Sequence, residues 1–301
     1  MDNKGKIGSA LLYGLTRPLA MLPLGFHRAC GRALGRLAGK VLRYRRDVVM
    51  TNLARSFPDK KYDELKDICN RFYAHFGKVF TEAIWFGGCT DPRRLVRSGI
   101  VRMSNPETVN RFHKAGKSVV VLTSHSGNWE LYGGIKNYPY PKQLDFPERD
   151  VCVVYRQQAF DRFLSRNRIA PVIDKKNYDG RVESFRALQY IFRHRDRSQM
   201  YIFINDQYPY TSKSKVPVRF MNQDTWAMDA AENLARHLGY AVVYLSTKEE
   251  DDGNYTMSFT PVCDDASQLP EGAILRKYFD LLEEDLREQP WNYLWTHKRW
   301  K

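Results

Sequence analysis

The chain has 301 residues, of which 43% are hydrophobic and 13% aromatic. This composition excludes a disordered chain and is sufficient for a sizeable core. Its 48 lysine and arginine residues exceed its 34 acidic residues, giving a net charge of +14. That charge predicts an anionic partner, whether nucleic acid, phospholipid head groups or an acidic carrier protein. The five cysteines are scattered and never spaced as Cys-x-x-Cys, which argues against a disulfide framework or zinc site and favours a reducing compartment.

The first segment, residues 7–26, is mostly apolar but contains Arg17, Pro18 and Pro23. A transmembrane helix needs about 20 predominantly apolar residues. We therefore interpret this segment as interfacial or re-entrant, with a true membrane span as the alternative. No cleavable signal peptide is evident, because the apolar stretch lacks an Ala-x-Ala-like site.

A row of cations follows directly, at steps of four, four, four and three residues: Arg28, Arg32, Arg36, Lys40 and Arg43. This spacing places them along one face of a helix. An apolar segment followed by a basic amphipathic helix is typical of anchoring to an anionic membrane; an ordinary solvated helix face is the alternative. We assign residues 1–57 to membrane-associated hydrophobic and basic helices and residues 58–301 to an α/β domain.

The remaining chain alternates between helical patterns and short apolar runs. Apolar residues at steps of three and four predict a long helix over residues 62–86. We expect strands at 118–123, 151–155, 200–204, 241–246 and 256–261, and helices at 129–136, 159–168, 182–193, 227–238 and 273–287. Continuous apolar strands separated by helices indicate an α/β fold with a mostly parallel central sheet flanked by helices.

The first of these strands runs into Ser124-His125-Ser126-Gly127-Asn128-Trp129-Glu130. Loops at the carboxyl ends of parallel strands are where α/β proteins bind ligands. On a regular helix His125 and Glu130 would point about 140° apart, so they converge only if His125 lies on the loop and Glu130 in the first helical turn. An imidazole oriented by a carboxylate is an effective general base. The spacing alone is weak evidence, and a structural histidine is the alternative.

Several blocks together resemble the bacterial lipid A late (lauroyl/myristoyl) acyltransferases of the lysophospholipid acyltransferase superfamily. They cover nearly the whole chain, in the family's order: His125 to Glu130, Tyr155-Arg156, Arg168, Asp206-Gln207, Pro217 to Thr225, and Asn292 to Lys301. The chain departs from the family's common pattern at Tyr208-Pro209 and at Met228-Asp229. These departures leave the acyl length and the acceptor open.

The resemblance implies that His125 deprotonates an acceptor hydroxyl and that Glu130 orients and polarises His125. Arg156 and Arg168 would hold phosphate or phosphopantetheine oxygens, a task that suits a planar cation; surface ion pairs are the alternative for both. Asn128 would assist His125 or only form the turn.

Asp206 and Gln207 complete the implied substrate site. Asp206 would orient Arg156 or only cap its loop, and we favour the structural role. The terminal cluster around His297 is interpreted as a packing or interfacial element.

The resemblance also implies the reaction partners. The acyl donor would be an acyl carrier protein thioester, and the acceptor a hydroxyl of a lipid A precursor at the cytoplasmic face of the inner membrane. No metal, redox cofactor or nucleic acid is implied.

Other functions are alternatives to acyl transfer onto a lipid A precursor. An acyltransferase acting on a lysophospholipid or aminolipid is the nearest alternative. A serine or zinc hydrolase is disfavoured because Gly-x-Ser-x-Gly and His-Glu-x-x-His are both absent. A non-enzymatic, basic membrane-binding protein remains the alternative of another class.

Overall fold

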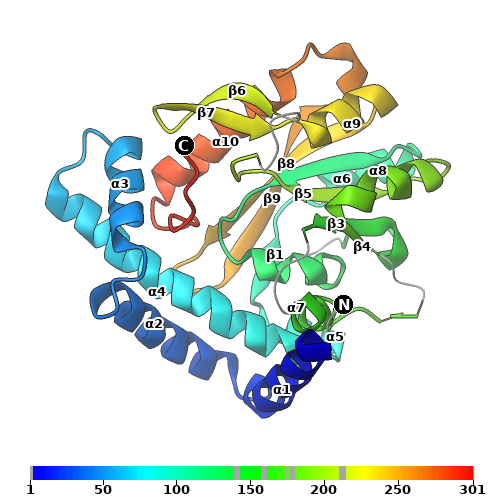
Figure 1. Cartoon of the computed structure of the whole chain (residues 1–301). Coiled ribbons are helices and arrows are strands. Elements are labelled where there is room, and N and C mark those ends of the chain that lie inside the picture. The colour runs from blue at the N-terminus through cyan, green and yellow to red at the C-terminus, as the bar shows by residue number, and fades with distance from the viewer. Residues whose placement is uncertain are drawn as a thin grey trace.

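A seven-stranded sheet forms the centre of the computed structural model, which describes residues 3–138, 143–156, 161–173, 175–176, 180–209 and 215–300. The sheet order is β1 (Val101–Met103), β9 (Tyr255–Cys263), β8 (Ala241–Glu249), β2 (Val119–Thr123), β5 (Met200–Ile204), β3 (Val151–Tyr155) and β4 (Arg181–Glu183). From β8 to β4 neighbouring strands are parallel, whereas β9 runs antiparallel to β8 and pairs in parallel with β1. The prediction of a mostly parallel sheet flanked by helices is confirmed (Figure 1).

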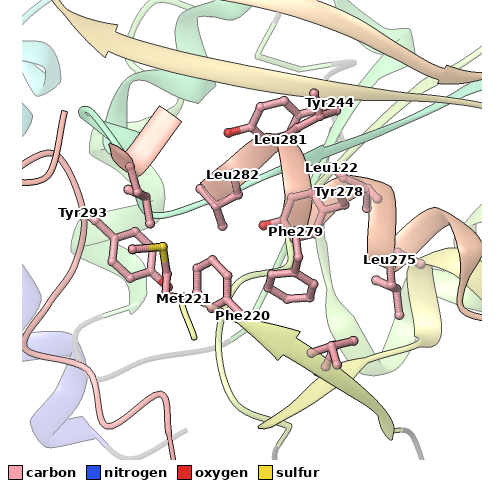
Figure 2. Close-up of a cluster of buried hydrophobic side chains, with 14 of the residues drawn as sticks. Leu122, Phe220, Met221, Tyr244, Leu275, Tyr278, Phe279, Leu281, Leu282 and Tyr293 are labelled. Carbon is pink, nitrogen blue, oxygen red and sulfur yellow. The ribbon is translucent and has the colours of Figure 1, made fainter. Parts of the chain in front are cut away.

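Both faces of the sheet are covered, which explains why its central strands are continuously apolar. Val120 and Leu122 of β2 belong to one core cluster, and Val119 and Val121 belong to the other. The first core lies under α9 (Ala230–Leu238), α10 (Ala273–Glu288) and the hairpin of β6 (Lys215–Phe220) and β7 (Gln223–Met228). Figure 2 shows its aromatic part around α10, where Phe220 lies beside Phe279. The second core is closed by α5 (Pro92–Ser98), α6 (Glu107–Lys114) and η1 (Trp129–Asn137).

The first four helices of the structure are α1 (Asn3–Ala20), α2 (Leu24–Lys40), α3 (Arg46–Ser56) and α4 (Tyr62–Gly87). Helix α2 lies alongside α4 (Figure 1). The two backbones approach closely because glycines face each other: Gly31, Gly35 and Gly39 are buried on α2, opposite Gly77 of α4. A methyl group on Gly35 would overlap the carbonyl oxygen of Tyr73. Glycine is therefore a packing requirement at this contact.

Within the described part of the chain, none of the helices combines the length and apolarity needed to cross a bilayer. The predicted membrane association of the N-terminal segment and the division at residue 57 both stay predictions. Large apolar side chains are nonetheless exposed on α1 and α2, including Leu11, Leu15, Leu34 and Leu37.

The structure differs from the predicted elements mainly at their ends. The helix expected over 182–193 begins as β4 and continues as α8 (Ser184–Arg193), and the helix expected over 227–238 begins inside β7. Residues 129–136 form the 3₁₀ helix η1, and η2 (Glu148–Asp150) precedes β3. Of the helix expected at 159–168, α7 (Asp161–Arg168) is seen, and residues 159–160 lie outside the described residues. A third 3₁₀ turn, η3 (Ala266–Gln268), follows β9.

Candidate active site

The site is built where β2 and β5 leave the sheet side by side. These parallel strands pair in register, with Thr123 opposite Ile204. His125 and Asp206 each follow two residues after that pair, so the register brings them together. His125 Nδ1 lies 2.7 Å from Asp206 Oδ1.

This pairing fixes the tautomer of His125. An ionised carboxylate only accepts hydrogen bonds, so Nδ1 carries the proton and Nε2 keeps a lone pair in the neutral ring. Gln207 Nε2 lies 3.3 Å from His125 Nε2 and donates to it. Burial alone would raise the pKa of the Asp206 carboxyl, but the charge and hydrogen bond of His125 outweigh burial and lower that pKa below its ordinary value. Asp206 is therefore the ionised partner that a histidine base requires.

Glu130 is not the carboxylate that contacts His125, which differs from the sequence expectation. Its two oxygens accept from Arg168, at 2.6 Å from Nε and 2.6 Å from Nη2. The physical reason is local. The turn of η1 directs Glu130 toward the end of α7, where a guanidinium offers two parallel donors, and Asp206 already occupies Nδ1 of His125.

The loop that carries His125 is held by hydrogen bonds to two other parts of the chain, the segment around Asn292 and helix α4. The backbone N–H of Gly127 donates to Asn292 Oδ1 at 2.8 Å, and His75 Nε2 donates to the Gly127 carbonyl at 3.0 Å. Gly127 has a φ of +60°, and a side chain there would overlap Thr247, so the loop requires glycine. The loop is thus fixed before any substrate arrives.

Asn128 also belongs to this support; it forms the turn and does not line the cleft. Its side chain is fully buried and donates to Glu82 Oε2 at 2.9 Å. Its Oδ1 accepts from the backbone N–H of Glu130 at 3.2 Å, which makes it the N-cap of η1.

A cleft of about 1350 Å³ opens beside His125. Its polar lining includes Glu130, Gln207 and three arginines: Arg156, Arg168 and Arg181. The apolar walls come from α4, α8 and α9, with Phe76, Phe80, Phe185, Leu188, Ile191, Phe192 and Leu234. Such a cleft offers cations for phosphate oxygens and apolar walls for a hydrocarbon chain. Among the described residues, no group of three or more His, Cys, Asp or Glu side chains is arranged to hold a metal ion.

The family model described as bacterial lipid A biosynthesis acyltransferase matches residues 5–301. The chain belongs to this family. The resemblance drawn from the block at His125 and from the terminal block is confirmed. No curated protein matches the chain.

Five residues expected from the sequence line the cleft of this lipid A acyltransferase family member: His125, Glu130, Arg156, Arg168 and Gln207. Asp206 was expected to cap its loop or to orient Arg156, whereas it contacts His125. Arg181 and the apolar face of α8 were missed, because their position in the cleft depends on β3 pairing with β4. The terminal block contributes Leu294 and Thr296 to the lining, and only the family resemblance singled that block out.

Proposed function

We propose that this protein transfers a fatty acyl group from an acyl carrier protein thioester to a hydroxyl of a lipid A precursor. The observation that carries the proposal is the His125–Asp206 pair beside a cleft lined by arginines and apolar side chains. Family membership supports acyl transfer in lipid A biosynthesis. The donor and the roles of individual residues are our proposal.

In this mechanism the acceptor hydroxyl replaces Gln207 as the hydrogen-bond partner of His125 Nε2. His125 takes the hydroxyl proton while the oxygen attacks the thioester carbonyl. Asp206 stabilises the imidazolium that forms. The new C–O bond forms, the C–S bond breaks, and the imidazolium returns its proton to the leaving thiolate, so His125 ends the cycle neutral.

The charged residues of the cleft bind the substrates. Arg156, Arg168 and Arg181 provide planar cations for phosphate oxygens of the acceptor or of the donor's phosphopantetheine arm. Glu130 holds the Arg168 guanidinium through two hydrogen bonds, so in this proposal Glu130 acts by orienting Arg168. The apolar walls receive the acyl chain.

We also propose that the protein works at the cytoplasmic face of the inner membrane. The exposed leucines of α1 and α2 give apolar surface for insertion, and the net charge of +14 attracts anionic lipid and an acidic carrier. Both substrates would then meet at the membrane surface.

The test incubates the purified protein with acyl carrier protein thioesters of several chain lengths and a panel of lipid A precursors, lysophospholipids and aminolipids. Products are read by mass spectrometry. We expect transfer to a lipid A precursor, and a loss of about 10²-fold or more in His125→Ala. His237→Ala is the matched control, because His237 also lines the cleft but has no role as base in this mechanism. Transfer to no acceptor, or equal rates for wild type and His125→Ala, would overturn the proposal.

A further inference from the structure

Glu82 of α4 is a fully buried carboxylate that lies outside the described lining of the cleft. Three donors from different elements satisfy it. Arg28 Nε lies 2.8 Å from Oε1, and Asn128 Nδ2 and the hydroxyl of Tyr255 lie 2.9 Å and 2.8 Å from Oε2. A buried carboxylate is stable only with such partners.

One of these partners belongs to the catalytic loop. Asn128 lies between His125 and Glu130, and it caps η1 through the backbone N–H of Glu130. Its side-chain amide donates to Glu82. Glu82 therefore fixes both the end of the His125 loop and the start of the helix that places Glu130 against Arg168.

Arg28 is the positive partner of Glu82, and it differs from the other cations of α2. Its side chain is only 12% exposed. Beyond Glu82 it donates from Nη2 to Asn254 Oδ1 at 2.9 Å and from Nη1 to the Asp252 carbonyl at 3.4 Å. Arg32 and Arg36 are exposed on the same helix. These cations are evenly spaced in the sequence, but Arg28 is a largely buried partner of Glu82, whereas Arg32 and Arg36 are surface cations.

We propose that Arg28 and Glu82 are positioning residues of the acyl-transfer site, so that helix α2 is part of the catalytic apparatus. The chain of contacts runs from Arg28 to Glu82, from Glu82 to Asn128, and from Asn128 into the loop between His125 and Glu130. This inference rests on the proposed function for its readout. Loss of Arg28 leaves a buried carboxylate without its counter-charge, and the Asn128 contact shifts to compensate. Displacements of about 1 Å at a catalytic group can lower the rate about 100-fold.

The test compares Arg28→Gln with Arg32→Gln in the full chain. Both changes remove one cation from the same helix, but only Arg32 is exposed, so Arg32→Gln should reduce binding to anionic phospholipid vesicles more than Arg28→Gln. We expect Arg28→Gln to lower kcat about ten-fold or more, with KM for both substrates within about two-fold of wild type, while Arg32→Gln keeps the wild-type kcat. Rates are expressed per folded protein, measured by thermal unfolding monitored by circular dichroism.

A second variant separates positioning from simple loss of fold. In the double variant Arg28→Gln/Glu82→Gln no unpaired charge is buried, and the amide oxygen at position 82 still accepts from Asn128. The double variant should therefore recover most of the kcat lost in Arg28→Gln. If Arg28→Gln does not fold, Arg28→Lys against Arg32→Lys gives the same comparison, because lysine keeps the charge but lacks the fork that reaches Glu82 and Asn254 together.

The outcomes distinguish this inference from the function on which it rests. A wild-type protein that transfers no acyl group defeats the proposed function. An active wild type with equal kcat in the Arg28 and Arg32 variants leaves the function standing and overturns the positioning role. A double variant no faster than Arg28→Gln also overturns it.

Discussion

The two ring nitrogens of His125 have different surroundings, and this difference gives each of them a separate task. Nδ1 faces Asp206, whose side chain is 2% exposed, and Nε2 faces the amide of Gln207 at the cleft. The hydrogen bond of Nδ1 to buried Asp206 is therefore permanent. The partner of Nε2 lies at the cleft and can be exchanged for a substrate hydroxyl. Trp129 packs its ring against that of His125, with the centroids 5.2 Å apart, and limits rotation of the imidazole.

We expect Asp206→Asn to lower kcat by about 100-fold or more. An amide at position 206 can donate to Nδ1, which favours the tautomer with the proton on Nε2 and removes the base from the cleft. The measurement is kcat at saturating donor and acceptor. Asp224→Asn, at a carboxylate that is 89% exposed, controls for loss of charge. A wild-type kcat in Asp206→Asn would show that this carboxylate has only a structural role.

Glu130 and Arg168 should behave as one unit. Because Glu130 holds the guanidinium by two hydrogen bonds of 2.6 Å, Glu130→Gln and Arg168→Gln should each raise KM for the phosphorylated acceptor. Combining the changes should add little, since both remove the same oriented cation. Steady-state kinetics on the two single variants and the double variant provide the check. Effects on KM that multiply in the double variant would mean that the two residues act independently.

The site residues could be named from sequence, but their pairing could not. His125 and Asp206 each stand two residues beyond an apolar strand, and this is a signal that sequence offers. Whether those two strands are neighbours depends on the sheet order, which no local pattern reveals. Glu130 was chosen as the partner of His125 because it is near in sequence, and the direction of one 3₁₀ turn decides otherwise.

Helix α4 carries a polar inner stripe as well as its aromatic one. His75, Lys78 and Glu82 recur at steps of three and four, and all three are buried. His75 donates to Glu249 from Nδ1 at 2.7 Å, and Lys78 donates to the same carboxylate at 2.6 Å. The helix was predicted from its apolar residues. The role of the polar stripe could not be predicted from the sequence, because it depends on β8, which carries Glu249, packing beside α4.

This stripe makes stability depend on pH in a defined direction. Burial alone would raise the pKa of Glu249, but His75 and Lys78 outweigh it and lower the pKa from 4.5 to about 2. Because the folded pKa is the lower one, the stabilisation is complete above about pH 4.5 and is lost as the pH falls toward 2. This shift corresponds to about 3 kcal/mol at most. Urea unfolding at several acidic pH values should show a steeper loss for wild type than for Glu249→Gln; parallel curves would contradict the assignment.

The contact between α2 and α4 should tolerate no side chain at Gly35. In Gly35→Ala the added methyl group meets backbone atoms of Tyr73, which cannot move aside as a flexible side chain would. We expect a loss of about 1–3 kcal/mol in the free energy of unfolding. Gly25→Ala on the same helix is the matched control, because its methyl group would have no neighbour within 4 Å. Chemical unfolding of the two variants is the measurement, and equal stabilities would show that the helices separate readily.

Among the strands, the longer ones of the central sheet were predictable, whereas β1, β4, β6 and β7 were not. Strands β3 and β5 agree with the expected ranges at both ends, because their apolar runs are bounded by polar residues. The hairpin of β6 and β7 was missed, since Ala227 near the end of β7 extends the helical pattern of α9 backwards. Short pairings such as β4 depend on the neighbouring strand more than on their own residues.

Across the whole molecule, helix α4 connects the N-terminal helices with the active site. One of its sides packs on the glycines of α2, and another holds the loop after β2 through His75 and Glu82. The surface that we propose to contact the membrane is therefore linked to the loop that carries His125 by two contacts, one between α2 and α4 and one between α4 and that loop.

That membrane surface can be tested separately from catalysis. Leu34 and Leu37 of α2 are 56% and 46% exposed, and if they insert into lipid, each contributes about 1 kcal/mol. The double variant Leu34→Gln/Leu37→Gln should therefore sediment with both neutral and anionic vesicles at least ten-fold less well than wild type. Raising the salt concentration should weaken binding to anionic vesicles only, because it screens charge and not apolar burial. Tyr62→Gln, at a side chain that is 68% exposed on α4, is the control. Vesicle binding that is the same in wild type and in the leucine variant would place the membrane contact elsewhere on the protein.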